Sequence, residues 1–197
     1  MVNHWELPTS ISVNNTEYAI RTDYRAVMDL LTAFSDKEML GESEEETNII
    51  RALLVLNILF IDEVKPEDQN EAIKKAIEFI DMGIESSRDV KKPTLMDWDQ
   101  DAPLIIPAIN KVLGREIRAD KYMHWWTFLS AYMEIGECSF THIINIRDKK
   151  AKGKKLEKWE LEYIQEHKEI VLLKEKLTEK EQLEREAEKN AVNELLG

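Results

Sequence analysis

The stretch that decides the fold runs from residue 96 to residue 160 and reads MDWDQDAPLIIPAINKVLGREIRADKYMHWWTFLSAYMEIGECSFTHIINIRDKKAKGKKLEKWE. It contains four of the five tryptophans, so most of the large aromatic surface available for a core or a partner lies here. The stretch begins acidic, continues through an aromatic segment and ends in a run of lysines.

The first helix of this stretch has clear start and stop signals. Asp99 or Asp101 is a suitable N-cap, Pro103 fits the first turn, and Gly114 is a suitable end. Pro107 lies inside the predicted helix and is expected to kink it.

Two further helices are predicted in this stretch, and the first of them is rich in aromatic residues. Residues 121–133 form the aromatic helix, Gly136 breaks it, and residues 139–146 form a short helix. Trp125 and Trp126 are adjacent and point about 100° apart on a helix. Either one packs in the core and the other contacts a partner, or both pack.

Residues 5–20 are the only convincing β material. Apolar and polar residues alternate on both sides of Asn14 and Asn15, which predicts a hairpin with these asparagines at its turn. Thr22 and Asp23 then begin a first helix.

Two further helices precede the opening stretch. Ser43 and Glu46 have the spacing of a capping box, and the helix after them is apolar over much of its circumference, so we expect it to be the central core helix. Pro66 begins a third helix, which Gly83 is expected to end.

The predicted fold class is mainly α: a helical bundle with a small N-terminal β-hairpin and a long C-terminal helix. The hairpin and bundle occupy residues 1–85, a linker 86–95, an aromatic helical lobe 96–155, and the C-terminal helix 156–197. The heptad repeat in the last segment is too broken to predict a coiled coil.

Composition and charge exclude several classes. The net charge of −12 argues against nucleic acid as the main partner, because phosphate neutralisation needs a basic surface. A single cysteine, Cys138, cannot form an internal disulfide and favours a reducing compartment. The N-terminus lacks a signal-peptide pattern, and the apolar stretch 48–61 is too short to span a bilayer. We expect a cytosolic protein with no membrane partner.

Three aspartates resemble the opening of a calcium loop. Asp97, Asp99 and Asp101 alternate as in an EF-hand, but Ala102 stands where that loop needs glycine and Ala108 where it needs glutamate. Helix capping explains these aspartates better.

No catalytic set emerges from the remaining polar residues. His124, His142 and Cys138 lack zinc-ligand spacing, and the sequence contains no phosphate loop or nucleophile elbow. We therefore expect no enzyme activity, no catalytic residue, no cofactor and no metal.

The lysine-rich run over residues 147–158 holds seven Lys or Arg against two acidic residues. In an acidic chain it is suited to an acidic partner, or to the acidic face of another copy, although a solvated loop explains it equally well. Nucleic acid is a weaker alternative, because the run lacks interleaved aromatic residues. The candidate partner-binding residues are Trp125, Trp126, Arg147, Lys149, Lys150 and Trp159.

Several segments together suggest a family: YAIRTDYRAVMDLL at 18–31, DWDQDAPLIIPAINKVLG at 97–114 followed by HWWTFLSAY at 124–132, and FTHIINIRDKK at 140–150. Over residue 18 to about 159 the chain resembles the bacteriophage Gp-fifteen family, whose members are encoded in phage tail-gene clusters. The resemblance implies a tail assembly chaperone that binds the tape-measure protein in the host cytoplasm and is absent from the mature virion.

Two other hypotheses stay open at this stage. One is a structural subunit retained in a phage particle, and the other is a small regulatory nucleic-acid-binding protein. Self-association is also expected, because one small domain cannot cover a long client.

Overall fold

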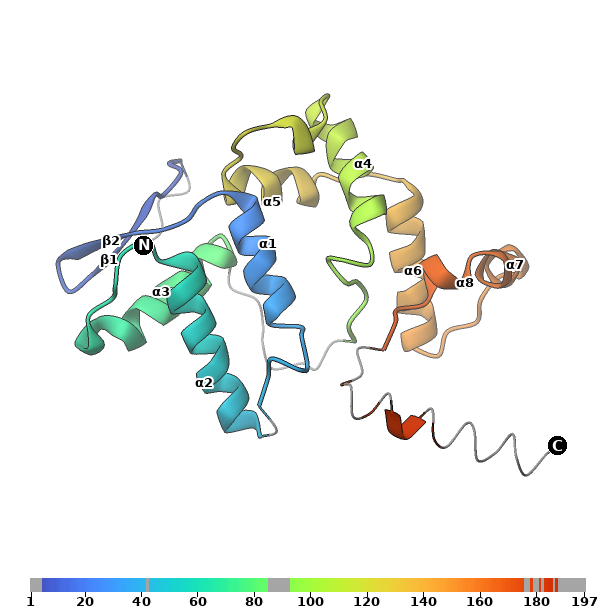
Figure 1. Cartoon of the computed structure of the whole chain (residues 1–197). Helices are drawn as coiled ribbons and strands as arrows, with labels where there is room; N and C mark the ends of the chain where they lie inside the picture. The colour runs from blue at the N-terminus through green and yellow to red at the C-terminus, as the bar shows by residue number, and fades with distance from the viewer. Residues whose placement is uncertain are drawn as a thin grey trace.

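A computed structural model describes residues 5–41, 43–84 and 93–175, and further along residues 178, 181, 183–185 and 187. Most of these residues are helical, and their only sheet is a two-stranded hairpin, as the sequence predicts. The hairpin and α3 (Gln69–Ile80) lie at one end of the molecule and α7 (Lys158–Glu166) at the other, with the remaining helices between them (Figure 1).

The hairpin pairs β1 (Ser10–Val13) with β2 (Thr16–Ala19) in antiparallel register, with Val13 opposite Thr16. Asn14 and Asn15 have φ values of 48° and 63°, the left-handed region that a tight two-residue hairpin turn requires and that asparagine tolerates. This confirms the predicted turn.

Helix α1 (Tyr24–Ala33) begins at Asp23, whose side chain accepts a hydrogen bond from the Arg25 N–H. Helix α2 (Glu44–Leu54) begins with the predicted capping box between Ser43 and Glu46. The chain then continues as a π-helical turn, η1 (Val55–Leu59).

The predicted central core helix covers both α2 and η1, and the prediction is confirmed for η1 but wrong for α2. None of the residues of α2 is buried, whereas Val55 and Leu59 in η1 are. The apolar sequence therefore reaches the core only through its last turn.

The third predicted helix is a 3₁₀ turn, η2 (Pro66–Asp68), followed by α3. Two left-handed residues end α3: Met82, with φ of 55°, and the predicted Gly83, with φ of 68°. The Gly83 N–H donates to the Glu78 carbonyl at 2.7 Å, the long bond of a Schellman motif.

Helix α4 (Ala102–Leu113) has Pro103 in its first turn and ends at Gly114, whose φ is 68°. It continues through Pro107. The elements after it are η3 (Ile117–Ala119), α5 (Trp125–Met133), α6 (Ser139–Ala151), α7 and α8 (Lys168–Val171).

The aromatic helix begins four residues later than predicted, for a backbone reason. The Tyr24 N–H donates to the Met123 carbonyl at 2.9 Å, and the Trp125 N–H donates to the Thr22 carbonyl at 2.7 Å. These bonds hold the preceding residues extended, so the helix begins only at Trp125.

A single long C-terminal helix is not what the described residues form. Helix α7 ends at His167, and α8 ends at Leu172, whose backbone is extended. From residue 176 onward most of the predicted helix lies outside the described residues.

The main core draws on both sides of the predicted linker. It includes Val13, Leu30 and Leu59 from the N-terminal segment and Ile109 and Trp125 from the aromatic segment. A smaller core joins α6 to α8 through Ile143, Ile146 and Val171. The predicted linker itself is described only at residues 93–95.

Candidate protein-binding surfaces

Trp125 and Trp126 both pack inside the molecule, which is the second of the two predicted alternatives. Each indole N–H donates at 2.8 Å to a carbonyl at the end of α3, Trp125 to Ile80 and Trp126 to Phe79. Because α5 begins directly against the C-terminus of α3, adjacent side chains both reach it. Neither side chain is more than 4% exposed.

His124 connects α5 to the N-terminal segment. Its Nδ1 accepts a hydrogen bond from the Trp126 N–H at 3.0 Å and so caps the helix. Since Nδ1 accepts, Nε2 carries the proton and donates to the Pro8 carbonyl at 2.9 Å. This bond holds the segment before β1 beside the aromatic helix.

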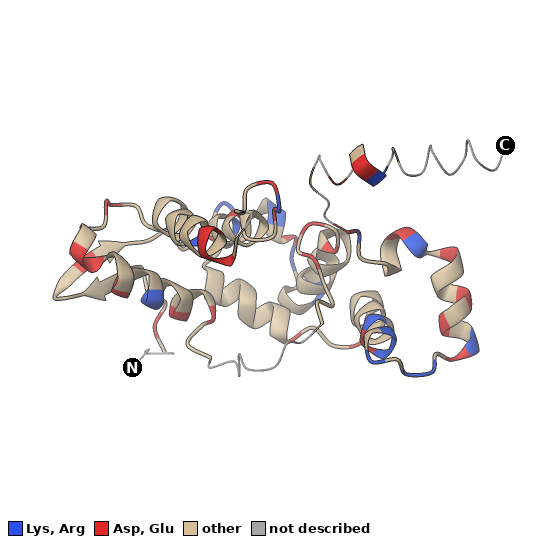
Figure 2. Ribbon diagram, turned by 90° about the horizontal axis from the view of Figure 1, so that it is seen from below, with Lys and Arg blue, Asp and Glu red and all other residues tan. Residues whose placement is uncertain are grey.

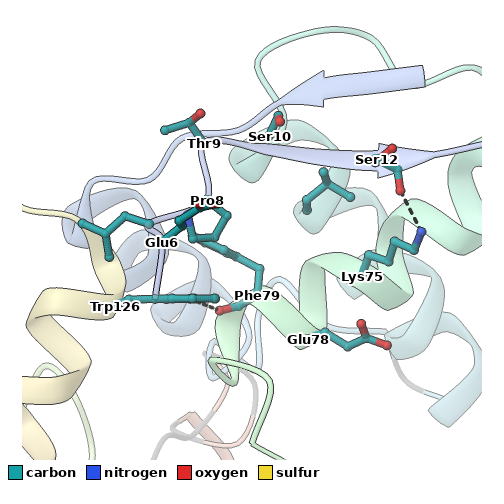
Figure 3. Close-up of a pocket in the computed structure, with 11 residues that line it drawn as sticks. Glu6, Pro8, Thr9, Ser10, Ser12, Lys75, Glu78, Phe79 and Trp126 are labelled. Atoms are coloured by element: carbon teal, nitrogen blue, oxygen red, sulfur yellow. Dashed lines mark hydrogen bonds between the residues drawn. The ribbon is translucent and has the colours of Figure 1, made fainter. Parts of the chain in front are cut away.

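A groove of about 520 Å³ lies between that segment, β1 and α3 (Figure 3). Its apolar lining comes from Leu7, Pro8, Ile11, Phe79 and Trp126, and Lys75 and Glu78 supply charge on the α3 side. The Lys75 ammonium donates to the Ser12 carbonyl at 2.7 Å, as the dashed line shows. We call this the β1 groove.

Arg147 is buried rather than available to a partner. Its guanidinium donates to both carboxylate oxygens of Asp101, at 2.7 and 2.9 Å. It also donates to the carbonyls of Leu95, Ile170 and Val171 at 2.7 to 2.9 Å. All five N–H donors of the side chain are therefore satisfied.

The Asp101 side chain does not have the capping role that the sequence predicts. Asp101 occupies the N-cap position of α4, but its side chain makes no capping bond. Its Oδ2 accepts from the Asp97 N–H at 3.0 Å in addition to Arg147. The Asp97 carboxylate accepts from the N–H groups of Asp99 and Gln100, which holds the turn before α4.

Lys149 lies beside α7, while Lys150 is exposed. The Lys149 ammonium is 2.7 Å from Oε1 of Glu160, whose carboxylate is buried. The bond from Lys149, and next the bond from the Glu157 N–H, hold the pKa of Glu160 below its ordinary value. This pair positions α7 against α6.

The lysines that follow form a fixed turn. Gly153 has φ of 63°, its N–H donates to the Lys150 carbonyl, and the Lys154 N–H donates to the Lys149 carbonyl at 2.8 Å. These two bonds make a Schellman motif. We define the basic turn as Lys150, Lys152, Lys154, Lys155 and Lys158; it is the blue segment that joins α6 to α7 in Figure 2.

Trp159 follows the basic turn and is 54% exposed. Of the predicted partner-binding residues, the fold therefore leaves Lys150 and Trp159 on the surface and brings Lys149 into an ion pair. Trp125, Trp126 and Arg147 are structural.

A second surface was missed by the sequence reasoning. Ile49 and Leu53 of α2 are 55% and 52% exposed. Glu44, Glu45, Asn48, Ile49 and Ala52 line a shallow hollow along the same helix. We call these residues with Leu53 the α2 face. The polar residues between the apolar positions of α2 were the sequence signal that this side of the helix is exposed.

No metal-binding cluster of three or more His, Cys, Asp or Glu side chains is present in the part of the chain that the structure describes. In the same residues, no helix combines the length and apolar character needed to cross a bilayer.

Comparison with known families matches residues 4–173 to the model described as "Bacteriophage Gp15 protein". The chain belongs to the bacteriophage Gp15 protein family. The match covers the hairpin, the core and the basic turn of this Gp15 chain, and it ends just after α8, which Arg147 holds. Searches of curated proteins and of solved structures gave no match.

Proposed function

We propose that this Gp15 protein is a non-enzymatic tail assembly chaperone. In the bacterial host cytoplasm it binds the tape-measure protein while the tail is assembled, and it leaves before the particle is complete. Membership of the Gp15 family supports a phage role. The presence of the β1 groove is the observation that supports a binding function.

The β1 groove is suited to an extended apolar segment of a client. Phe79 and Trp126 provide a rigid aromatic floor, and Leu7, which is 53% exposed, stands at the rim. β1 pairs on one side with β2, and on its second edge Lys75 holds the Ser12 carbonyl, so the rest of that edge offers backbone groups to a strand laid in the groove. Side-chain burial would supply affinity and the strand edge would supply orientation.

Charge supports the same function. A net charge of −12 keeps a complex with an aggregation-prone client in solution, because like-charged complexes repel one another. The chaperone mechanism is stoichiometric: it covers apolar client surface until tail tube subunits replace it.

Co-expression with the tape-measure protein encoded in the same tail-gene cluster tests this proposal. We expect more soluble tape-measure protein in the presence of the chain, and co-purification of the two. Leu7→Asp should abolish co-purification, whereas Leu161→Asp, at a leucine of α7 that is 49% exposed, should preserve it. Unchanged solubility together with no co-purification would overturn the chaperone function.

A further inference from the structure

The α2 face has no packing partner among the residues that the structure describes. A helix in a folded domain normally buries an apolar stripe, yet α2 buries no residue and exposes Ile49 and Leu53. Glu44 and Glu45 lie at one end of this apolar strip and are exposed. The occupant that fits it is apolar in part and positively charged beside the apolar part.

The basic turn with Trp159 has that chemistry. The described carboxylates give no ion pair to Lys154 or Lys155, although Lys152 pairs with Asp148 and Lys158 with Glu162. The Schellman motif at Gly153 fixes the turn, so little backbone freedom is lost when it docks. Trp159 places an amphipathic aromatic ring beside the lysines.

These two surfaces do not meet within one molecule. In Figures 1 and 2 the α6–α7 region lies at one end, and α2 lies in the other half of the molecule. A contact between them therefore requires two copies.

We propose that copies of this chain associate head to tail, with the basic turn and Trp159 of one copy docked on the α2 face of the next. This goes beyond the proposed function, since it concerns the chain alone.

Charge selects this arrangement over a symmetric one. Residues 1–85 carry seven Lys or Arg and eighteen Asp or Glu, whereas residues 147–158 carry seven and two. Two α2 faces would bring acid against acid, and two basic turns would bring lysine against lysine, so a two-fold contact through either surface is repulsive. When the basic turn of one copy docks on the α2 face of another, each of the two copies keeps one unused surface. Further copies can therefore add, to form a closed ring or an open filament.

Sedimentation of the purified full chain at low ionic strength tests this proposal. We expect oligomers larger than a dimer that grow with concentration and dissociate as salt is raised. Lys154→Glu with Lys155→Glu should give monomers. Glu44→Lys with Glu45→Lys should do the same while sparing Glu46, which the capping box needs.

Mixing the two variants provides the decisive measurement. Each variant retains the surface that the other has lost, and the two altered surfaces are complementary to each other in charge, so a mixture should form large oligomers again although each variant alone is monomeric. The chain with all four substitutions should form large oligomers again. Lys74→Glu with Lys121→Glu, at two exposed lysines elsewhere, changes the net charge by the same amount as Lys154→Glu with Lys155→Glu and should leave assembly intact.

Several outcomes would overturn the head-to-tail contact: a monomeric wild-type chain, a mixture that stays monomeric, or loss of assembly in the control variant. None of them bears on the chaperone function, because the tape-measure protein is absent from the experiment.

Discussion

The Arg147 guanidinium and the Asp101 carboxylate form a two-bond ion pair with side chains only 6% and 1% exposed. Removing two charges from water is costly, and the pair persists because every remaining Arg147 donor binds a backbone carbonyl. The pair joins α4, α6 and α8.

Asp101→Ala should lower the free energy of unfolding by about 3–5 kcal/mol, because it leaves the buried Arg147 charge unpaired. Urea denaturation followed by circular dichroism measures this. Arg118→Ala at the exposed pair with Glu116 is the control and should cost about 0–1 kcal/mol. A loss at Asp101 no larger than that of the control would contradict the structural role.

Gly153→Ala should destabilise the chain by about 1–2 kcal/mol, since a side chain is strained at φ of 63°. An added Cβ meets no atom within 4 Å at Gly153 or at Gly136, and only Gly153 of these two has a positive φ. Gly136→Ala should therefore be neutral or slightly stabilising by thermal denaturation. Equal effects of the two substitutions would show that the turn is not constrained.

Tyr18→Phe should make stability less dependent on pH in the acid range. The hydroxyl of Tyr18 and then the amide of Asn14 donate to the Asp68 carboxylate and hold the pKa of that carboxylate below its ordinary value. The stabilisation is therefore present above the ordinary pKa and is lost as the pH falls through the lowered pKa.

Urea midpoints across the acid range check this pH dependence. The gap between wild type and Tyr18→Phe should be widest at neutral pH and should narrow in acid. Tyr122→Phe, which breaks a bond to the uncharged Thr22 hydroxyl, should give a gap that stays constant with pH. A constant gap for Tyr18→Phe would refute the coupling.

Mass spectrometry of purified phage particles should detect the major tail proteins and no stoichiometric amount of this chain. A chaperone is displaced before the tail is complete, whereas a structural subunit stays. Stoichiometric presence in the particle would favour the structural-subunit hypothesis.

The start and stop signals of the sequence predicted much of the local structure. The asparagine turn, the Ser43 capping box and the Gly114 helix end each depend on a few neighbouring residues, and each is confirmed. The resemblance to the phage family is also confirmed.

Features that depend on distant partners were not predictable in this way. The start of α5 is set by pairing with residues 22–24, and the burial of both tryptophans depends on the end of α3. Arg147 belonged to a lysine-rich run in the sequence, yet it is the one residue of that run that reaches Asp101. Local pattern cannot separate a surface cation from a buried one when the partner lies 46 residues away.

Helix α8 and Leu172 are held mainly through their backbone carbonyls. Arg147 donates to the carbonyls of Ile170 and Val171, and the Gln100 amide donates to those of Glu169 and Leu172. Every residue type presents the same carbonyl, so this attachment depends on the path of the chain more than on its side chains. Apart from Val171, which packs in the smaller core, a substitution in α8 leaves these bonds in place, whereas an insertion or deletion would move the carbonyls away from Arg147 and Gln100.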